Sequence, residues 1–138
     1  MNTEERFEAL ATADAASMEA LADEILASGA AVSVTSGPES VSAPVRVSVP
    51  GSDATTVVLG HVALTRCTVA VEGTRGDGLR AGYDLPGAVA AAICDAECER
   101  NGAFSARVHD LCLAAQRANA ARSDDRANLV AMTRVEEP

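Results

Sequence analysis

Four residues on two predicted helices have the types and the spacing that could bind zinc. Cys94 and Cys98 are four residues apart, and His109 and Cys112 are three apart, so each pair would share one face of its helix. Two such helices packed face to face would offer three thiols and an imidazole to the metal. However, closed zinc sites more often use C-x2-C knuckles, and a cysteine among alanines is usually a small buried hydrophobe. Free thiols are therefore the stronger interpretation, and a metal site is the weaker alternative.

Other residues whose side chains could take part in a reaction do not combine into a catalytic set. His61 has no serine, cysteine or carboxylate at a diagnostic spacing. The glycines at 73, 76 and 78 lack the Lys-Ser/Thr and the following helix of a phosphate loop, so we interpret them as a hairpin turn. Four arginines near the C-terminus could bind an anionic ligand or an acidic partner, or could pair with neighbouring acids: Arg117, Arg122, Arg126 and Arg134. Composition and spacing alone indicate no self-contained enzyme.

Arg66 stands out because it interrupts the longest run of strand-forming residues, Leu59 to Val71. Val62 and Leu64 follow one phase of the side-chain alternation, whereas the apolar residues from Cys67 onward follow the other. The phase changes at Thr65-Arg66, which requires a bulge, a twist or a passage from one packing environment to another. This position is where we first look for function.

The elements around this run predict an α+β domain. Residues 3–28 predict an N-terminal helix that ends at Gly29, with Asp14 as a cap if the helix breaks near Thr12. Between residues 30 and 84 the period changes to two, which predicts an antiparallel meander of about five short strands. Its turn signals are Gly37-Pro38, Pro50-Gly51 and the glycine-rich stretch 73–78.

The C-terminal part predicts two helices and a strand-like tail. Asp84 is a candidate cap for a helix over Ala88 to Arg100. Ser105 can begin a last helix that fades between Arg122 and Arg126, and residues 129–135 then form the tail. The whole chain, 1–138, is expected to be one domain with helices flanking one face or end of a small sheet.

Length and charge restrict the class of protein further. The chain has 138 residues, no secretory signal and no apolar run near the ~20 residues that span a bilayer, so we expect a soluble cytoplasmic protein without a membrane partner. Its formal charge is -9, all 11 basic residues are arginine, and aromatic residues make up 2%. Such a composition is typical of proteins from salt-loving, GC-rich organisms. It also argues against nucleic acid as a partner, because no basic stripe is present.

Three pieces of the sequence, taken in order, resemble the G subunit of the carbon-phosphorus lyase core complex. The first piece is Leu59-Gly60-His61 followed by Leu64-Thr65-Arg66 and Val69, the second is Gly82-Tyr83, and the third is Arg126-Ala-Asn-Leu-Val-Ala-Met132-Thr-Arg134. Members of that family carry a Gly-acidic-x-x-x-Thr-Arg/Glu strand, a Gly-Tyr step and a C-terminal Arg-x-x-Phe-Phe-x-Met-x-Arg. The resemblance covers the chain from about Ala30 to its end.

This sequence departs from the family pattern at three places. His61 stands where an acidic residue is usual, and Leu129 and Val130 replace two phenylalanines. The Leu-Gly-Arg-Asp approach to the long helix is shortened to Leu85-Pro86-Gly87. A subunit contact made by that loop in relatives is therefore not carried over.

The resemblance implies a part in phosphonate breakdown. In that family the G subunit works with the H, I and L subunits to displace adenine from ATP by a phosphonate, and the J subunit later cleaves the carbon-phosphorus bond. The I subunit is held to carry the nucleosidase-like chemistry, so the resemblance implies for this chain no cofactor of its own and ATP as a substrate of the complex.

The resemblance also implies which residues could meet substrate or partner subunits: Thr65, Arg66, Gly82, Tyr83, Arg126, Met132 and Arg134. None of them is assigned a catalytic role. The apolar tail would suit docking on another subunit, and Arg66 would either tie subunits together or steer the anionic substrate. Two alternatives stay open, a scaffold of the complex without influence on its chemistry and a small cytoplasmic metal-binding protein.

Overall fold

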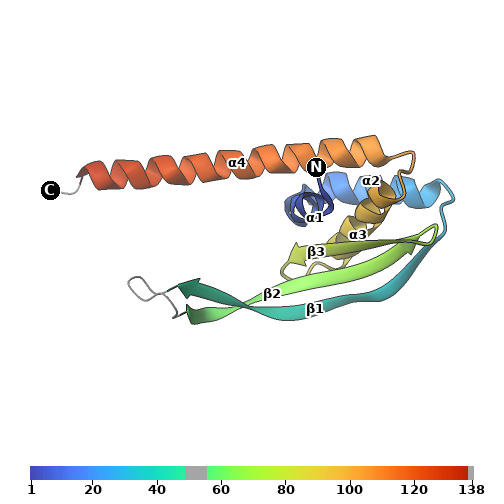
Figure 1. The fold of residues 1–138 in the computed structure, drawn as a ribbon, viewed down its shortest axis with the longest axis horizontal. Helices are drawn as coiled ribbons and strands as arrows, with labels where there is room; N and C mark the ends of the chain where they lie inside the picture. The colour runs from blue at the N-terminus through green and yellow to red at the C-terminus, as the bar shows by residue number, and fades with distance from the viewer. Residues whose placement is uncertain (49–55, 137–138) are drawn as a thin grey trace.

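The computed structural model describes the backbone of residues 1–48 and 56–136, and the side chains of these residues except 47–48 and 130–136. In chain order the elements are α1 (Thr3–Thr12), α2 (Ala15–Ala27), β1 (Val32–Ser48), β2 (Thr56–Val71), β3 (Thr74–Ala81), α3 (Leu85–Glu99) and α4 (Ser105–Glu136). The three strands form one antiparallel sheet in the order β1-β2-β3, and the four helices lie on one side of it (Figure 1). The predicted α+β class and the meander are confirmed.

The N-terminal segment is two helices, because the chain breaks between Thr12 and Ala15. Asp14 caps the second helix as predicted, and its carboxylate accepts the N–H of Ser17 at 3.0 Å. The predicted end is also confirmed, since Gly29 follows α2 with φ +89°, a left-handed conformation that favours glycine. The prediction of one helix over 3–28 was therefore wrong only in that this segment forms two helices.

The sheet has three strands and not the predicted five. Gly37-Pro38 does not turn the chain; it lies among the register shifts of β1 between Val34 and Glu39, so two expected strands are one long strand. The tight turn between β2 and β3 is Glu72-Gly73, and β3 already begins at Thr74. The predicted turn at Pro50-Gly51 falls outside the described residues.

Gly76 and Gly78 belong to β3 and not to a hairpin turn, which corrects their interpretation. A Cβ at Gly76 would lie 2.2 Å from the carbonyl oxygen of Ala92, and one at Gly78 would lie 2.3 Å from that of Ala88. The alanine-rich α3 therefore rests almost directly on the backbone of β3. Glycine is required here by close packing and not by turn geometry.

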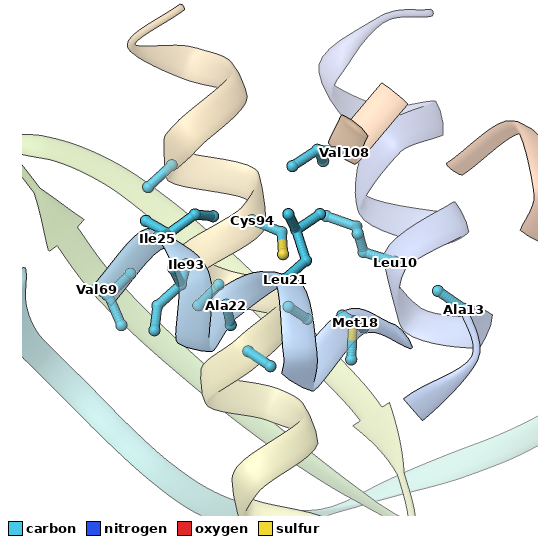
Figure 2. Close-up of a cluster of buried hydrophobic side chains, with 14 of the residues drawn as sticks. Leu10, Ala13, Met18, Leu21, Ala22, Ile25, Val69, Ile93, Cys94 and Val108 are labelled. Carbon is cyan, nitrogen blue, oxygen red and sulfur yellow. The ribbon is translucent and has the colours of Figure 1, made fainter. Parts of the chain in front are cut away.

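The hydrophobic core lies between the sheet and the helices. Figure 2 shows side chains from all four helices and β2 meeting in it. The members with at most 2% exposure include Leu10, Met18, Ile25, Val69, Ile93 and Val108. In β2 the buried positions alternate from Thr65 to Val71, so one face of this half of the strand enters the core.

Two charged side chains attach α1 to the rest of the fold. The Arg80 guanidinium on β3 donates to the carbonyl oxygens of Leu10, Ala11 and Ala13 at 2.8–3.2 Å, which satisfies groups left open at the end of α1. Arg6 forms an ion pair with Asp95 of α3 at 2.7 Å. The other carboxylate oxygen of Asp95 accepts the backbone N–H of Asp77, so this residue also holds the position of β3.

The last helix continues through the predicted fade and the predicted strand-like tail. α4 runs without a break to Glu136, so both expectations were wrong. Its first part packs on the core through Val108, Cys112 and Ala115, whereas residues 120–129 are all exposed and project beyond the other helices (Figure 1). Within the described part of the chain, no helix is both long and apolar enough to cross a membrane.

Candidate functional site

Thr65 and the Gly82-Tyr83 step are brought together by hydrogen bonds. Thr65 is fully buried, and its hydroxyl donates to the carbonyl oxygen of Gly82 at 2.6 Å and accepts the N–H of Asp84 at 3.0 Å. The N–H of Gly82, which has φ +75°, donates to the carbonyl oxygen of Ala63 at 2.8 Å. The Asp84 side chain in turn accepts the N–H of Gly87 and caps α3, as predicted.

These hydrogen bonds fix a loop that carries an exposed tyrosine. Tyr83 lies between the two anchored residues and is 83% exposed. Thr65 cannot contact a ligand, because its side chain is inside the core and both of its hydrogen-bonding functions are used. Its effect on any ligand or partner would pass through the loop that presents Tyr83.

Arg66 points away from the core, on the sheet face that no described helix covers. Its Nε donates to Glu39 Oε1 of β1 at 2.8 Å, and the arginine side chain remains 61% exposed. The two residues are cross-strand partners, so the ion pair follows from the register of β1 and β2. Sequence reasoning missed Glu39, because the two register shifts of β1 hide the pairing.

A concavity of about 940 Å³ lies where this open face meets the N-terminal end of α1. Besides Arg66 it is lined by polar residues of the sheet, among them Thr68, Arg75 and Asp77, and by Glu4 and Phe7 of α1. Asp77 accepts hydrogen bonds from Thr68 at 2.7 Å and from Arg75 at 3.2 Å. Both arginines of the concavity are thus paired with carboxylates, so an anion would have to compete with Glu39 and Asp77.

The outer parts of β1 and β2 form a two-stranded arm, residues 41–48 and 56–63. β3 pairs with β2 only from Leu64 to Val71, so the arm extends beyond the three-stranded part of the sheet (Figure 1). The register places Val41, Ala43 and Val45 on the same face as Leu64 and Val62. This is the face of Arg66, opposite to the face that α3 covers.

The change of phase at Thr65-Arg66 is therefore a passage between two packing environments, one of the three predicted explanations. Inside the body the apolar face of β2 points to the helices, and in the arm it points the other way. Val62 is 45% exposed and Leu59, the extra residue of a bulge opposite Val45 and Arg46, is 71% exposed. No helix that the structure describes lies on this face of the sheet (Figure 1).

The C-terminal candidates lie on α4. Arg126 is exposed on the projecting part of the helix. The backbone of Met132 and Arg134 is helical, and their side chains lie outside what the structure describes. The structure thus groups Thr65, Gly82 and Tyr83, places Arg66 on the other face of the sheet, and puts the tail on a separate projecting element.

The four potential zinc ligands are not gathered into a metal site. Burial raises the pKa of the Cys94 thiol to about 12, and burial raises that of Cys112 to about 11; neighbouring thiols add to both effects. His109 is exposed, whereas both of these thiols are buried. The described residues include no group of three or more His, Cys, Asp or Glu that could hold a metal ion. Protonated, buried thiols fit core packing better than metal binding or nucleophilic chemistry.

These features define a small α+β protein whose conspicuous surfaces are a projecting apolar arm and a projecting helix; the described residues include no preassembled set of catalytic groups. A comparison with known families matches residues 2–136 to the family described as phosphonate metabolism protein PhnG. No curated protein matches the chain. The match covers nearly the whole chain, so this protein belongs to the PhnG family of phosphonate metabolism proteins. The resemblance seen in the sequence motifs is thereby confirmed.

Proposed function

We propose that this chain is a non-autonomous subunit of the carbon-phosphorus lyase system and assists the transfer of an alkylphosphonate onto the ribose of ATP with release of adenine. In this proposal the chain binds no cofactor, ATP is a substrate of the complex, and the partners are the I, H, J and L subunits in the cytoplasm. Membership of the PhnG family supports this context. The chain's own contribution is to dock on a partner, with the I subunit as the first candidate.

The observation that carries the docking proposal is the apolar face of the arm. A two-stranded ribbon has little stability of its own in water, and an uncharged apolar face on it is a liability unless another surface covers it. Arg46 is the one Asp, Glu, Lys or Arg residue among the described residues of the arm, and it lies on the opposite face to Val45. An apolar surface of this kind suits the centre of a subunit interface, where charged residues are depleted.

The decisive experiment is co-expression of this chain with the I, H, J and L subunits. We expect it to co-purify with them and to support adenine release that depends on both ATP and a phosphonate. If it neither co-purifies nor supports this reaction, the proposal fails.

Two matched double variants test the arm. Replacing Val45 and Val62 by Thr keeps β-branched side chains but removes the apolar face, and we expect recovery in the complex to fall at least about tenfold, the equivalent of ~1.4 kcal/mol. Replacing Ser42 and His61 by Thr on the other face of the arm should leave recovery unchanged. Equal losses in both variants would contradict the assignment of the interface to the apolar face.

Variants of Arg66 distinguish an active subunit from a scaffold. The scaffold is the second candidate, because Arg66 is already paired with Glu39 and an anionic substrate would have to compete for it. In Arg66→Ala the positive charge is lost, whereas Glu39→Ala removes the partner and leaves the charge. If Arg66 steers the anionic substrate, kcat/KM should fall in Arg66→Ala and should be maintained or rise in Glu39→Ala. If both variants assemble and turn over like the unaltered chain, the scaffold function is supported instead.

A further inference from the structure

A second depression, lined mainly by apolar residues, lies on the helical side of the molecule, between α2 and α3. It measures about 460 Å³, within the range of sites that bind side chains or small ligands. Its walls come from one face of each helix, Ala22 and Leu26 from α2 and Leu85, Val89 and Ile93 from α3, and Pro38 of β1 closes it. Figure 2 shows the two helices crossing, with Ala22 and Ile93 between them. We call this depression the α2–α3 groove.

The groove is open to solvent and retains exposed apolar side chains. Leu26 is 45% exposed and Leu85 is 48% exposed. In the loop just before Leu85, Gly82 and Asp84 are held by the hydrogen bonds of Thr65, and Tyr83 between them is exposed. Exposed apolar side chains around a hollow of this kind are typical of a surface that a partner covers.

Two carboxylates on α2 line the groove and have no ion-pair partner among the described residues. Glu19 and Asp23 are one helical turn apart, on the face that lines the groove. Glu24, the next residue on the same helix, does have a partner, because it pairs with Arg107 of α4. The chain therefore neutralises the acid that faces its own last helix and leaves the two groove acids available.

We propose that the α2–α3 groove binds a short amphipathic helix of a partner protein, with apolar side chains in the groove and arginine or lysine beside Glu19 and Asp23. The walls are helix faces with residues spaced three and four apart, which is the geometry that accepts a third helix. The two unpaired carboxylates select a basic partner. This surface is separate from the arm, and its assignment does not depend on the proposed enzymatic context.

The test uses two synthetic peptides and the full-length, nitrogen-15-labelled protein. Both peptides are 14-residue helices with identical leucine positions; one carries lysines beside the leucines and the other carries glutamates. We expect the lysine peptide to shift the backbone amide resonances of residues 19–26 and 85–93 and to bind at least tenfold more tightly than the glutamate peptide.

Charge reversal in the protein makes the test specific. In the double variant Glu19→Lys/Asp23→Lys the preference should invert toward the glutamate peptide. The matched control, Glu8→Lys/Asp110→Lys, makes the same change in net charge at exposed residues outside the groove and should keep the original preference. Leu26→Asn, at a half-exposed position, should weaken binding of both peptides without unfolding the chain.

Three results would overturn the proposal. They are the absence of shifts with the lysine peptide, shifts centred on the arm or on α4, and a control variant that inverts the preference as strongly as the groove variant. The last result would show that the peptide preference depends on the net negative charge of the chain and not on the groove.

Discussion

The hydroxyl of Thr65 offers the sharpest test of how this fold presents its candidate site. Thr65→Val preserves the shape of the side chain and removes only the group that joins Gly82 and Asp84 to β2. One donated and one accepted hydrogen bond are lost, and the Gly82 carbonyl and the Asp84 N–H lose their partner. Each such loss costs ~1–3 kcal/mol, with the lower end appropriate here because both loop residues are partly exposed.

We therefore expect Thr65→Val to lower the free energy of unfolding by about 2 kcal/mol and the melting temperature by about 6–10 °C. Urea unfolding followed by circular dichroism measures the first quantity. Thr65→Ser is the control, because it keeps the hydroxyl and loses one buried methyl group, a cost of about 1 kcal/mol.

A second readout separates the loop from global stability. Tyr83 is the sole tyrosine of a chain without tryptophan, so intrinsic fluorescence reports on this loop alone. Time-resolved anisotropy should show faster local motion of Tyr83 in Thr65→Val than in Thr65→Ser or the unaltered protein. If the valine variant is as stable as the unaltered chain and its Tyr83 is equally restrained, the role assigned to Thr65 is wrong.

Three further predictions concern the framework of the site. Gly76→Ala should lower the free energy of unfolding in urea by ~2–3 kcal/mol, because the new methyl group meets the Ala92 carbonyl of α3; Gly73→Ala, in open space with φ +79°, should cost only ~1 kcal/mol, and an equal cost would contradict the packing argument. Arg80→Met should cost ~2–3 kcal/mol and speed hydrogen exchange in α1, since three backbone carbonyls lose a partly buried donor. Arg75→Met on the open face should change stability by less than ~0.5 kcal/mol, so similar losses in the two variants would refute the account. Burial raises the pKa of Cys94 from 9.0 to about 12, so the free energy of unfolding should be constant below pH 9 and fall as the pH rises toward 12, because the thiol ionises first in the unfolded chain. The slope should approach ~1.4 kcal/mol per pH unit. In urea unfolding curves measured over a series of pH values, Cys94→Ala should reduce this alkaline loss of stability.

Local signals in the sequence predicted the parts of the fold that depend on near neighbours. The caps at Asp14 and Asp84 were found because a carboxylate three residues before an open N–H works in any tertiary setting. The phase change at Thr65-Arg66 was also visible, because side-chain alternation is a property of the strand itself. What the sequence could not show is which side of the sheet the helices would cover.

The errors came from signals whose meaning depends on distant contacts. Gly37-Pro38 is a turn signal by composition, yet pairing with β2 carries the strand past it. The glycines at 76 and 78 were mistaken for a turn because the approach of α3 is not encoded near them. The residues 123–125, Ser-Asp-Asp, remove apolar character without ending the helix, so α4 continues where burial stops.

The sequence likewise predicted some features of the candidate site and not others. Motif order identified Thr65, Arg66, Gly82 and Tyr83, but only the structure separates the buried hydroxyl from the exposed arginine and tyrosine. Glu39 and the α2–α3 groove were not predicted, because the first requires the irregular register of β1 and the second requires the crossing of two helices.

The passage of β2 from the core into the arm implies a gradient of local opening along one strand. From Thr65 to Val71 the strand lies between β1 and β3 and helices cover one of its faces, so most of its amides should exchange with solvent only through unfolding of much of the protein. Toward Thr56 the same strand has one partner strand and is not covered by any described helix, so its amides should exchange through small local openings. A partner surface that covers the arm would slow amide exchange in the outer half of β2 and leave exchange in the inner half unchanged. The inner half is therefore an internal reference when hydrogen exchange is used to detect a partner.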